Sequence, residues 1–230
     1  MKTAKGCDIM DAAVFSAVLP MLVKGFYITM EIAIIGILLG FVLGAASGYA
    51  LQSGSRVAQA VAGVYVWIIR GTPIVVQALY VYFVVPAIIS LAQGEQYVLD
   101  STIAGIIVIT VNAGAFISAI VKGALESVDV GQIEAGYALG LTKRQVLFHV
   151  IIPPAFKVML PALFNQFIIS VKDTAMLSII SVNEITRQTQ NYVARTYNTI
   201  PAYTMCAVFY LVLLSALMIL QHVVEQRLKK

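Results

Sequence analysis

The fourth long apolar stretch of the chain carries amide, hydroxyl and charged side chains at helical spacing. Gln166, Ser170 and Asp173 stand at positions i, i+4 and i+7, so a helix places them on one face. Asn165 and Lys172 lie on the neighbouring face. A carboxylate, an ammonium group and amides can bind a polar solute, and polar residues inside membrane spans are functional candidates by default.

Three further polar side chains interrupt other apolar stretches. They are Asn112, Gln77 and Arg70, and Arg70 comes three residues before Pro73. A structural role is the alternative, because amides and charges also bridge helices within a bundle. Arg70 can equally extend its charge to the membrane interface. The sequence leaves both interpretations open.

The sequence predicts no catalytic residue and no metal site. His149 and His222 are the only histidines, and no cluster of metal ligands or nucleophile–base pair accompanies them. Cys7 and Cys206 are far apart, so a disulfide framework is not expected. The glycine-rich motifs that bind nucleotides are absent from the sequence. We therefore expect no cofactor in this chain and no nucleic-acid partner, and any energy that its work needs is expected to come from elsewhere.

The composition indicates which elements position these residues. Of the 230 residues, 60% are hydrophobic and 11% are charged, against roughly 25% charged in soluble domains. A membrane-spanning helix needs about 20 apolar residues. Four stretches meet this need: 19–48, 102–121, 158–180 and 202–222. The sequence predicts an all-α polytopic membrane protein with about five spans.

The remaining span lies in the region 57–91, which Arg70-Gly71-Thr72-Pro73 interrupts. Proline breaks or kinks a helix, so we interpret this region as one crossing entered through a kink, with two crossings as the alternative. The expected organisation is a single transmembrane domain over 19–225. An extracytoplasmic tail, 1–18, precedes it, and a cytoplasmic tail, 226–230, follows it.

Five crossings place the termini on opposite sides, and the Lys/Arg distribution selects the orientation. One side holds eight basic residues: Arg56, Lys122, Lys143, Arg144, Lys157, Arg227, Lys229 and Lys230. The other side holds four: Lys2, Lys5, Arg187 and Arg195. The excess predicts that the N-terminus is outside and that the C-terminus and the polar segment 123–157 are in the cytoplasm.

Glycines recur every fourth residue in the first span, at Gly36, Gly40, Gly44 and Gly48. Such a stripe lets another helix approach closely. The partner helix belongs either to the same chain or to another subunit, and the spacing does not distinguish them.

The polar segment 123–157 predicts two short helices at the membrane face. Gly140 is placed to end the first, because glycine adopts the left-handed conformation there. Thr142 and Gln145 have the spacing of a capping box for the second. Pro153-Pro154 is expected to break that second helix and to give a stiff junction with the next span.

The spacing Glu134-Ala135-Gly136-x3-Gly140-x12-Pro153 resembles the cytoplasmic loop signature of permease subunits in ABC importers. Gly136 stands where that family has a second alanine. Ile69 to Gln77 resembles the Arg-Gly-Thr-Pro motif of polar amino-acid permeases. Asn165 to Thr174 and Glu184 to Gln188 resemble further motifs of the same family, and the glutamine permeases are the most similar branch. The resemblance covers about residues 19–228.

This resemblance implies a type I importer permease of a bacterial inner membrane, with the loop docked on a separate subunit that binds ATP. It implies a second permease chain and an extracytoplasmic solute-binding protein, which Glu184 and Arg187 could contact, or these two could be a solvated surface pair. Asp173 is then expected to face the substrate ammonium and Lys172 or Arg70 its carboxylate. Gln77, Asn112, Asn165 and Gln166 would line the path. A self-sufficient carrier or channel for polar solutes is the alternative, although no inverted repeat is visible.

Overall fold

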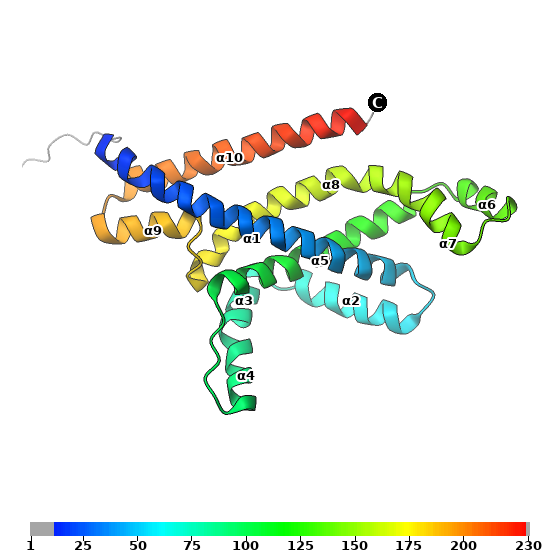
Figure 1. Ribbon diagram of the computed structural model, residues 1–230, viewed down its shortest axis with the longest axis horizontal. Coiled ribbons are helices and arrows are strands. Elements are labelled where there is room, and N and C mark those ends of the chain that lie inside the picture. The colour runs from blue at the N-terminus through cyan, green and yellow to red at the C-terminus, as the bar shows by residue number, and fades with distance from the viewer. Residues whose placement is uncertain (1–11, 229–230) are drawn as a thin grey trace, which may run out of the picture.

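The computed structural model describes residues 12–228, and all regular structure in that range is helical (Figure 1). Five helical segments are long and apolar enough to cross a membrane: Val14–Gln52, Ile74–Gln93, Ser101–Glu126, Lys143–Ile180 and Thr199–Arg227. The predicted all-α fold with five candidate spans is confirmed.

The predicted tails lie largely outside the described residues, as do Cys7 and the ends 1–11 and 229–230. Helix α1 (Ala12–Gln52) already begins within the stretch expected as an N-terminal tail, and α10 (Thr199–Leu228) extends into the expected C-terminal one. The helical segments are therefore longer than the apolar stretches that predicted them. Polar residues at their ends add turns that a hydropathy pattern does not count.

Helix α1 packs along α5 (Ser101–Glu126) through the glycine stripe. A Cβ added to Gly44 would lie 2.7 Å from the Ile117 side chain and 2.8 Å from the Gly114 carbonyl oxygen. A Cβ on Gly48 would lie 2.7 Å from the Ser118 carbonyl oxygen. The stripe therefore serves close packing within one chain.

The second region folds as two helices that meet at a corner. Helix α2 (Arg56–Arg70) returns beside α1 and ends where the Gly71 amide donates to the Trp67 carbonyl, 2.9 Å away. Helix α3 (Ile74–Leu79), the π-helical turn η1 (Tyr80–Val84) and α4 (Val85–Gln93) then run away from the body at a steep angle (Figure 1). The interpretation of 57–91 as one crossing agrees with the structure, in which the candidate span is Ile74–Gln93. The break at Pro73 separates α2 from the span completely.

The second half of the chain runs from the polar loop to the opposite end of the molecule. Helix α6 (Val130–Ala138) and the short α7 (Lys143–Gln145) lie at one end (Figure 1). The π-helical turn η2 (Val146–Ile151), α8 (Ile152–Asp173) and the 3₁₀ helix η3 (Thr174–Ile180) lead to α9 (Ile185–Thr196). Helix α9 lies beside the start of α1, so the loop and α9 occupy opposite ends.

Candidate functional site

Helix α6 is fixed at its start by Asp129, which the sequence analysis did not identify, and at its end by the predicted Gly140. The Asp129 carboxylate accepts from the Gln132 amide at 3.3 Å at the start of the helix. Gly140 has φ +81° at its end, and the Leu141 amide donates to the Gly136 carbonyl at 3.2 Å. This is the glycine stop of a helix, in which the last carbonyls find donors beyond the final turn. The predicted role of Gly140 is confirmed.

The second helix of the loop starts at the predicted capping box. The Thr142 amide donates to Gln145 Oε1 at 2.9 Å, and the Gln145 amide donates to Thr142 Oγ1 at 3.4 Å. The helix does not break at Pro153-Pro154, however, and this expectation was wrong. The π-helical turn η2 precedes the prolines, and the Ile152 amide donates to Leu147, five residues earlier. The wider turn absorbs the missing proline donors, so a continuous helix connects the loop to α8.

The two faces of α6 differ in what they contact. Gly136 is buried, and a Cβ there would lie 3.3 Å from the Val146 side chain. Val130, Glu134 and Tyr137 stand at i, i+4 and i+7 on the other face, and all three are exposed, Val130 by 65% and Tyr137 by 47%. Ala135 and Pro153 are also exposed. The helix therefore presents a carboxylate between an apolar and an aromatic side chain, on a backbone that packs against η2.

Gln77 and Asn112 meet at the corner between α2 and α3. The Gln77 amide donates to the carbonyl oxygens of Ile69 at 2.8 Å and Thr72 at 3.0 Å, and so satisfies carbonyls left free where α2 ends. Asn112 donates to Gln77 Oε1 at 3.0 Å and is itself 7% exposed. Two of the predicted polar residues are thus brought together, and their hydrogen bonds hold the broken helix against α5.

Arg70 and Tyr65 attach the same corner to α5. The Arg70 guanidinium lies over the Phe116 ring, 5.2 Å from its centroid. The Tyr65 hydroxyl donates to the Val111 carbonyl at 2.7 Å, and a Cβ on Gly114 would lie 2.7 Å from that hydroxyl. Gly114 therefore makes room for Tyr65. Nothing in the sequence distinguished either pair from ordinary apolar packing.

The polar residues of α8 divide between the inside and the surface. Gln166 and Ser170 are 5% and 2% exposed, whereas Asn165 and Lys172 are exposed and Asp173 is half-buried. This division follows the two helix faces that the spacing predicts. Within residues 12–228, no hydrogen bond or ion pair joins these side chains to Gln77, Asn112 or Arg70.

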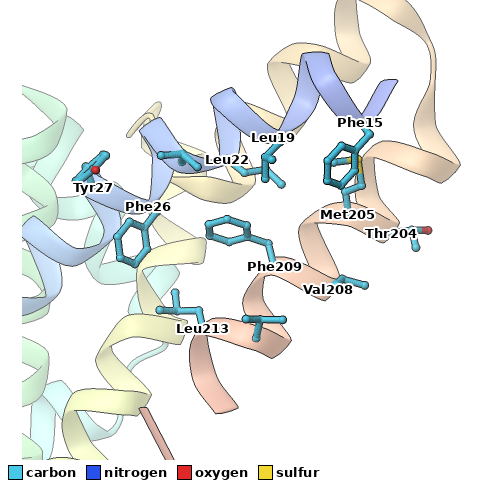
Figure 2. A pocket seen from close by; sticks show the side chains of 12 residues that line it. Phe15, Leu19, Leu22, Phe26, Tyr27, Thr204, Met205, Val208, Phe209 and Leu213 are labelled. Carbon is cyan, nitrogen blue, oxygen red and sulfur yellow. The ribbon is translucent and has the colours of Figure 1, made fainter. Parts of the chain in front are cut away.

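Two hollows of the described chain are too apolar to hold a polar solute by themselves. One, of about 400 Å³, lies at the corner, and Thr72 and Gln77 are its polar lining residues. The other, of about 510 Å³, lies between α1 and α10 (Figure 2). Phe15, Phe26 and Phe209 line it, and the Thr204 hydroxyl at its edge already donates to the Ile200 carbonyl at 2.8 Å.

Glu184 is buried at the start of α9, although the resemblance suggested a surface contact. Its carboxylate accepts from the amides of Thr186 at 2.7 Å and Arg187 at 2.6 Å, and from the Tyr210 hydroxyl at 3.0 Å. Gly25 of α1 lies against it, since a Cβ there would lie 2.7 Å from the Ile185 backbone. Glu184 therefore caps α9 and joins it to α10. The half-buried Arg187 donates to Ser181 Oγ at 3.4 Å and stays partly accessible.

Replacing Glu184 with alanine is expected to lower the free energy of unfolding by about 1–2 kcal/mol, because a helix cap is lost.

A second prediction concerns the pH dependence of stability. Burial raises the pKa of the Glu184 carboxyl above its ordinary 4.5, while the hydrogen bonds that it accepts from Thr186, Arg187 and Tyr210 act in the opposite direction. A raised folded-state pKa means that the stabilising effect of protonation is complete below pH 4.5 and is lost as the pH rises through the folded-state value. Unfolding of Glu184→Gln should not show this pH dependence. If the stability of the wild type and that of Glu184→Gln depended on pH in the same way, the pH dependence would not arise from Glu184.

Comparison with known proteins places the chain among transport permeases. Residues 36–230 match the family described as binding-protein-dependent transport system inner membrane component. The glutamine transport system permease protein GlnP of Escherichia coli (strain K12) is 38% identical over 95% of this chain and 97% of its own length. The L-cystine transport system permease protein TcyB of Bacillus subtilis (strain 168) is 36% identical over 92% of this chain and 88% of its own length.

Solved structures give the same fold. A chain of an amino acid ABC transporter crystallised with histidines superposes with a TM-score of 0.85 at 29% identity, covering 95% of this chain and 99% of that one. A chain of the MetNI methionine ABC transporter in an inward-facing conformation superposes with a TM-score of 0.75 at 22% identity, covering 96% and 100%. The second likeness concerns the fold alone.

Proposed function

The chain belongs to the family of binding-protein-dependent transport system inner membrane components, and on that premise we propose that it is the transmembrane subunit of an ATP-driven importer for a polar amino acid. The permease resemblance of its sequence is thereby confirmed. The similar permeases are named for glutamine and cystine, so the proposed cargo is glutamine or a related polar amino acid. ATP would be bound and hydrolysed by a separate subunit.

The observation that carries the proposal is the construction of α6. An isolated amphipathic helix in a flexible loop could not transmit force between two proteins. Here Gly136 packs against Val146, and the chain continues as one helix from Lys143 into α8. Movement of the exposed Glu134 face would therefore move a membrane span. We propose that this face, together with Ala135, Gly140 and Pro153, forms the contact with the ATPase.

The proposed orientation follows from the distribution of basic residues. The loop would be in the cytoplasm and the N-terminus outside, in a bacterial inner membrane. Helix α9, at the opposite end from α6, would then face the solute-binding protein. Its accessible residues include Arg187 and the exposed Arg195. Glu184 contributes indirectly, by fixing the start of α9.

The proposed substrate path needs two permease chains. The corner hollow of one chain is nearly apolar, whereas a dehydrated amino acid needs partners for its ammonium and its carboxylate. Asn165, Lys172 and Asp173 remain accessible on α8, and no ion pair within residues 12–228 uses either charge. We propose that these groups complete the path against a second chain, which is identical or closely related. Gln77, Asn112, Gln166 and Arg70 would hold its walls.

The test is uptake by the complete transporter in proteoliposomes, with a panel of labelled amino acids. Uptake of glutamine or a related polar amino acid is expected to require ATP, the ATPase and the binding protein. The permease alone should not hydrolyse ATP. Uptake by the permease without the ATPase would instead establish a self-sufficient carrier.

In the same assay Asp173→Asn is expected to reduce uptake about tenfold or more, because the substrate ammonium loses a charged partner. ATPase association should stay normal, and Glu95→Gln provides a surface control. Normal uptake and substrate preference in Asp173→Asn would remove Asp173 from the path.

A further inference from the structure

A pocket of about 550 Å³ lies on the side of α6 opposite to Glu134. It opens between α6 and the segment that continues from η2 into α8. Gln132, Ala135, Gly136 and Leu139 form one wall, and His149, Val150 and Pro153 form part of the other. Gly136 keeps the pocket open on the α6 side, since it has no side chain. Glu134, in the proposed ATPase contact, lies on the other face of this helix, whereas Ala135 and Pro153 belong both to that contact and to the pocket lining.

The polar groups of this pocket suit an anion. Lys157 and His149 line it, and no lining residue is acidic. Lys157 is exposed, and no ion pair among residues 12–228 involves it. The ion pair of this region joins Lys122 and Glu126, 3.8 Å apart. Nδ1 of His149 lies 3.0 Å from the Gln145 carbonyl oxygen, so Nδ1 carries the proton of that bond. Nε2 of the neutral imidazole is then an acceptor, so the Lys157 ammonium is the group of the pocket that can donate to an anion.

The apolar part of the pocket lining suits a lipid better than a free anion. Leu139, Leu141 and Pro154 line it beside the basic groups. Lys157 lies five residues beyond Ile152, about 7.5 Å along α8 at 1.5 Å per residue. The neighbouring Phe148, Phe156 and Val158 are 52%, 46% and 56% exposed, as expected for a segment in contact with acyl chains. Basic pockets beside spans on the cytoplasmic side bind anionic lipid headgroups.

We propose that this pocket binds the phosphate of an anionic phospholipid of the cytoplasmic leaflet through the Lys157 ammonium. This proposal rests on the proposed function in one respect: the proposed function places the pocket on the cytoplasmic side of the membrane. The headgroup would lie between α6 and the start of α8, beside the proposed ATPase contact, with which the pocket shares Ala135 and Pro153. The polar segment 123–157 would then respond to the lipid composition of the membrane.

The test uses the complete permease–ATPase complex in nanodiscs of phosphatidylcholine with about one part in four phosphatidylglycerol. Phosphatidylglycerol supplies the anionic headgroup that the proposal requires. Native mass spectrometry counts the retained phosphatidylglycerol, and ATP hydrolysis is measured in parallel. Lys157→Gln is expected to reduce retention about fivefold, since one basic side chain near the surface contributes about 1 kcal/mol. Lys143→Gln removes a basic residue of the same loop outside the pocket and should retain the lipid.

Three results would overturn the proposal. One is equal retention of phosphatidylglycerol by Lys157→Gln and the wild type. Another is displacement of the lipid by inorganic phosphate, which would show a site for the free anion. The third is loss of the ATPase from Lys157→Gln with unchanged lipid retention, which would assign the pocket to an acidic residue of that subunit. Failure of the wild-type chain to hold any ATPase would instead contradict the proposed function. Lipid retention by the permease alone would then still test the lipid site separately.

Discussion

A permease with Glu134→Ala and Gly140→Val is expected to lose its ATPase while still inserting into the membrane. The first change removes the exposed carboxylate of α6. The second places a β-branched residue at φ +81°, which costs about 1–3 kcal/mol and displaces the end of the helix. Losing one partner of a charged contact at an interface costs about 2–5 kcal/mol, so ATPase binding should fall about thirtyfold or more. Co-purification with a tagged permease measures this directly.

The end of α4 provides a matched control. Gly94 also has a positive φ, +73°, with no atom within 4 Å of an added Cβ, and the exposed Glu95 follows it. Glu95→Ala with Gly94→Val therefore repeats both changes far from the loop. This control should keep its ATPase. Equal retention of the ATPase by both double variants would contradict the docking role of α6.

The second large effect is expected from Gly44→Val in the glycine stripe. The added Cβ would lie 2.7 Å from Ile117 and 2.8 Å from the Gly114 backbone, and a carbonyl oxygen of a packed helix cannot easily move away. Overpacking of this kind typically costs about 1–3 kcal/mol. We expect a lower midpoint of denaturation in detergent and a lower yield of folded permease.

Gly63→Ala is the control for the stripe. Gly63 lies in α2, and an added Cβ there has no atom within 4 Å. Alanine inside a helix is favoured over glycine by about 0.5–1 kcal/mol, so this variant should be as stable as the wild type or more stable. A Gly44→Val protein with wild-type stability would show that α1 and α5 do not pack as described.

The sequence predicted those parts of the fold that depend on local rules. The glycine stop at Gly140 and the capping box at Thr142 are each set by a few neighbouring residues, and both were correct. The continuity of the helix through Pro153-Pro154 was not predictable. A π-helical turn absorbs the missing donors, and no residue pattern before the prolines indicates it.

The candidate site was less predictable because its contacts join distant segments. Gln77 and Asn112 were identified as polar residues in apolar surroundings, but their hydrogen bond depends on the corner between α2 and α3. The burial of Glu184 depends on Gly25 and Tyr210, from two other helices. A helix-capping acid and a surface acid look the same in one sequence, so its position in a polar segment suggested exposure.

The most direct test of the central claim is cross-linking from the outer face of α6 in the complete complex. Cys7 and Cys206 are first replaced by serine, and a single cysteine is then placed at Tyr137, which is 47% exposed on the Glu134 face. A short bifunctional reagent should link this position to the ATPase, whereas a cysteine at the exposed Arg195 of α9 should link to the binding protein. A link from Tyr137→Cys to the binding protein, or no link to an ATPase present in the same complex, would contradict the account.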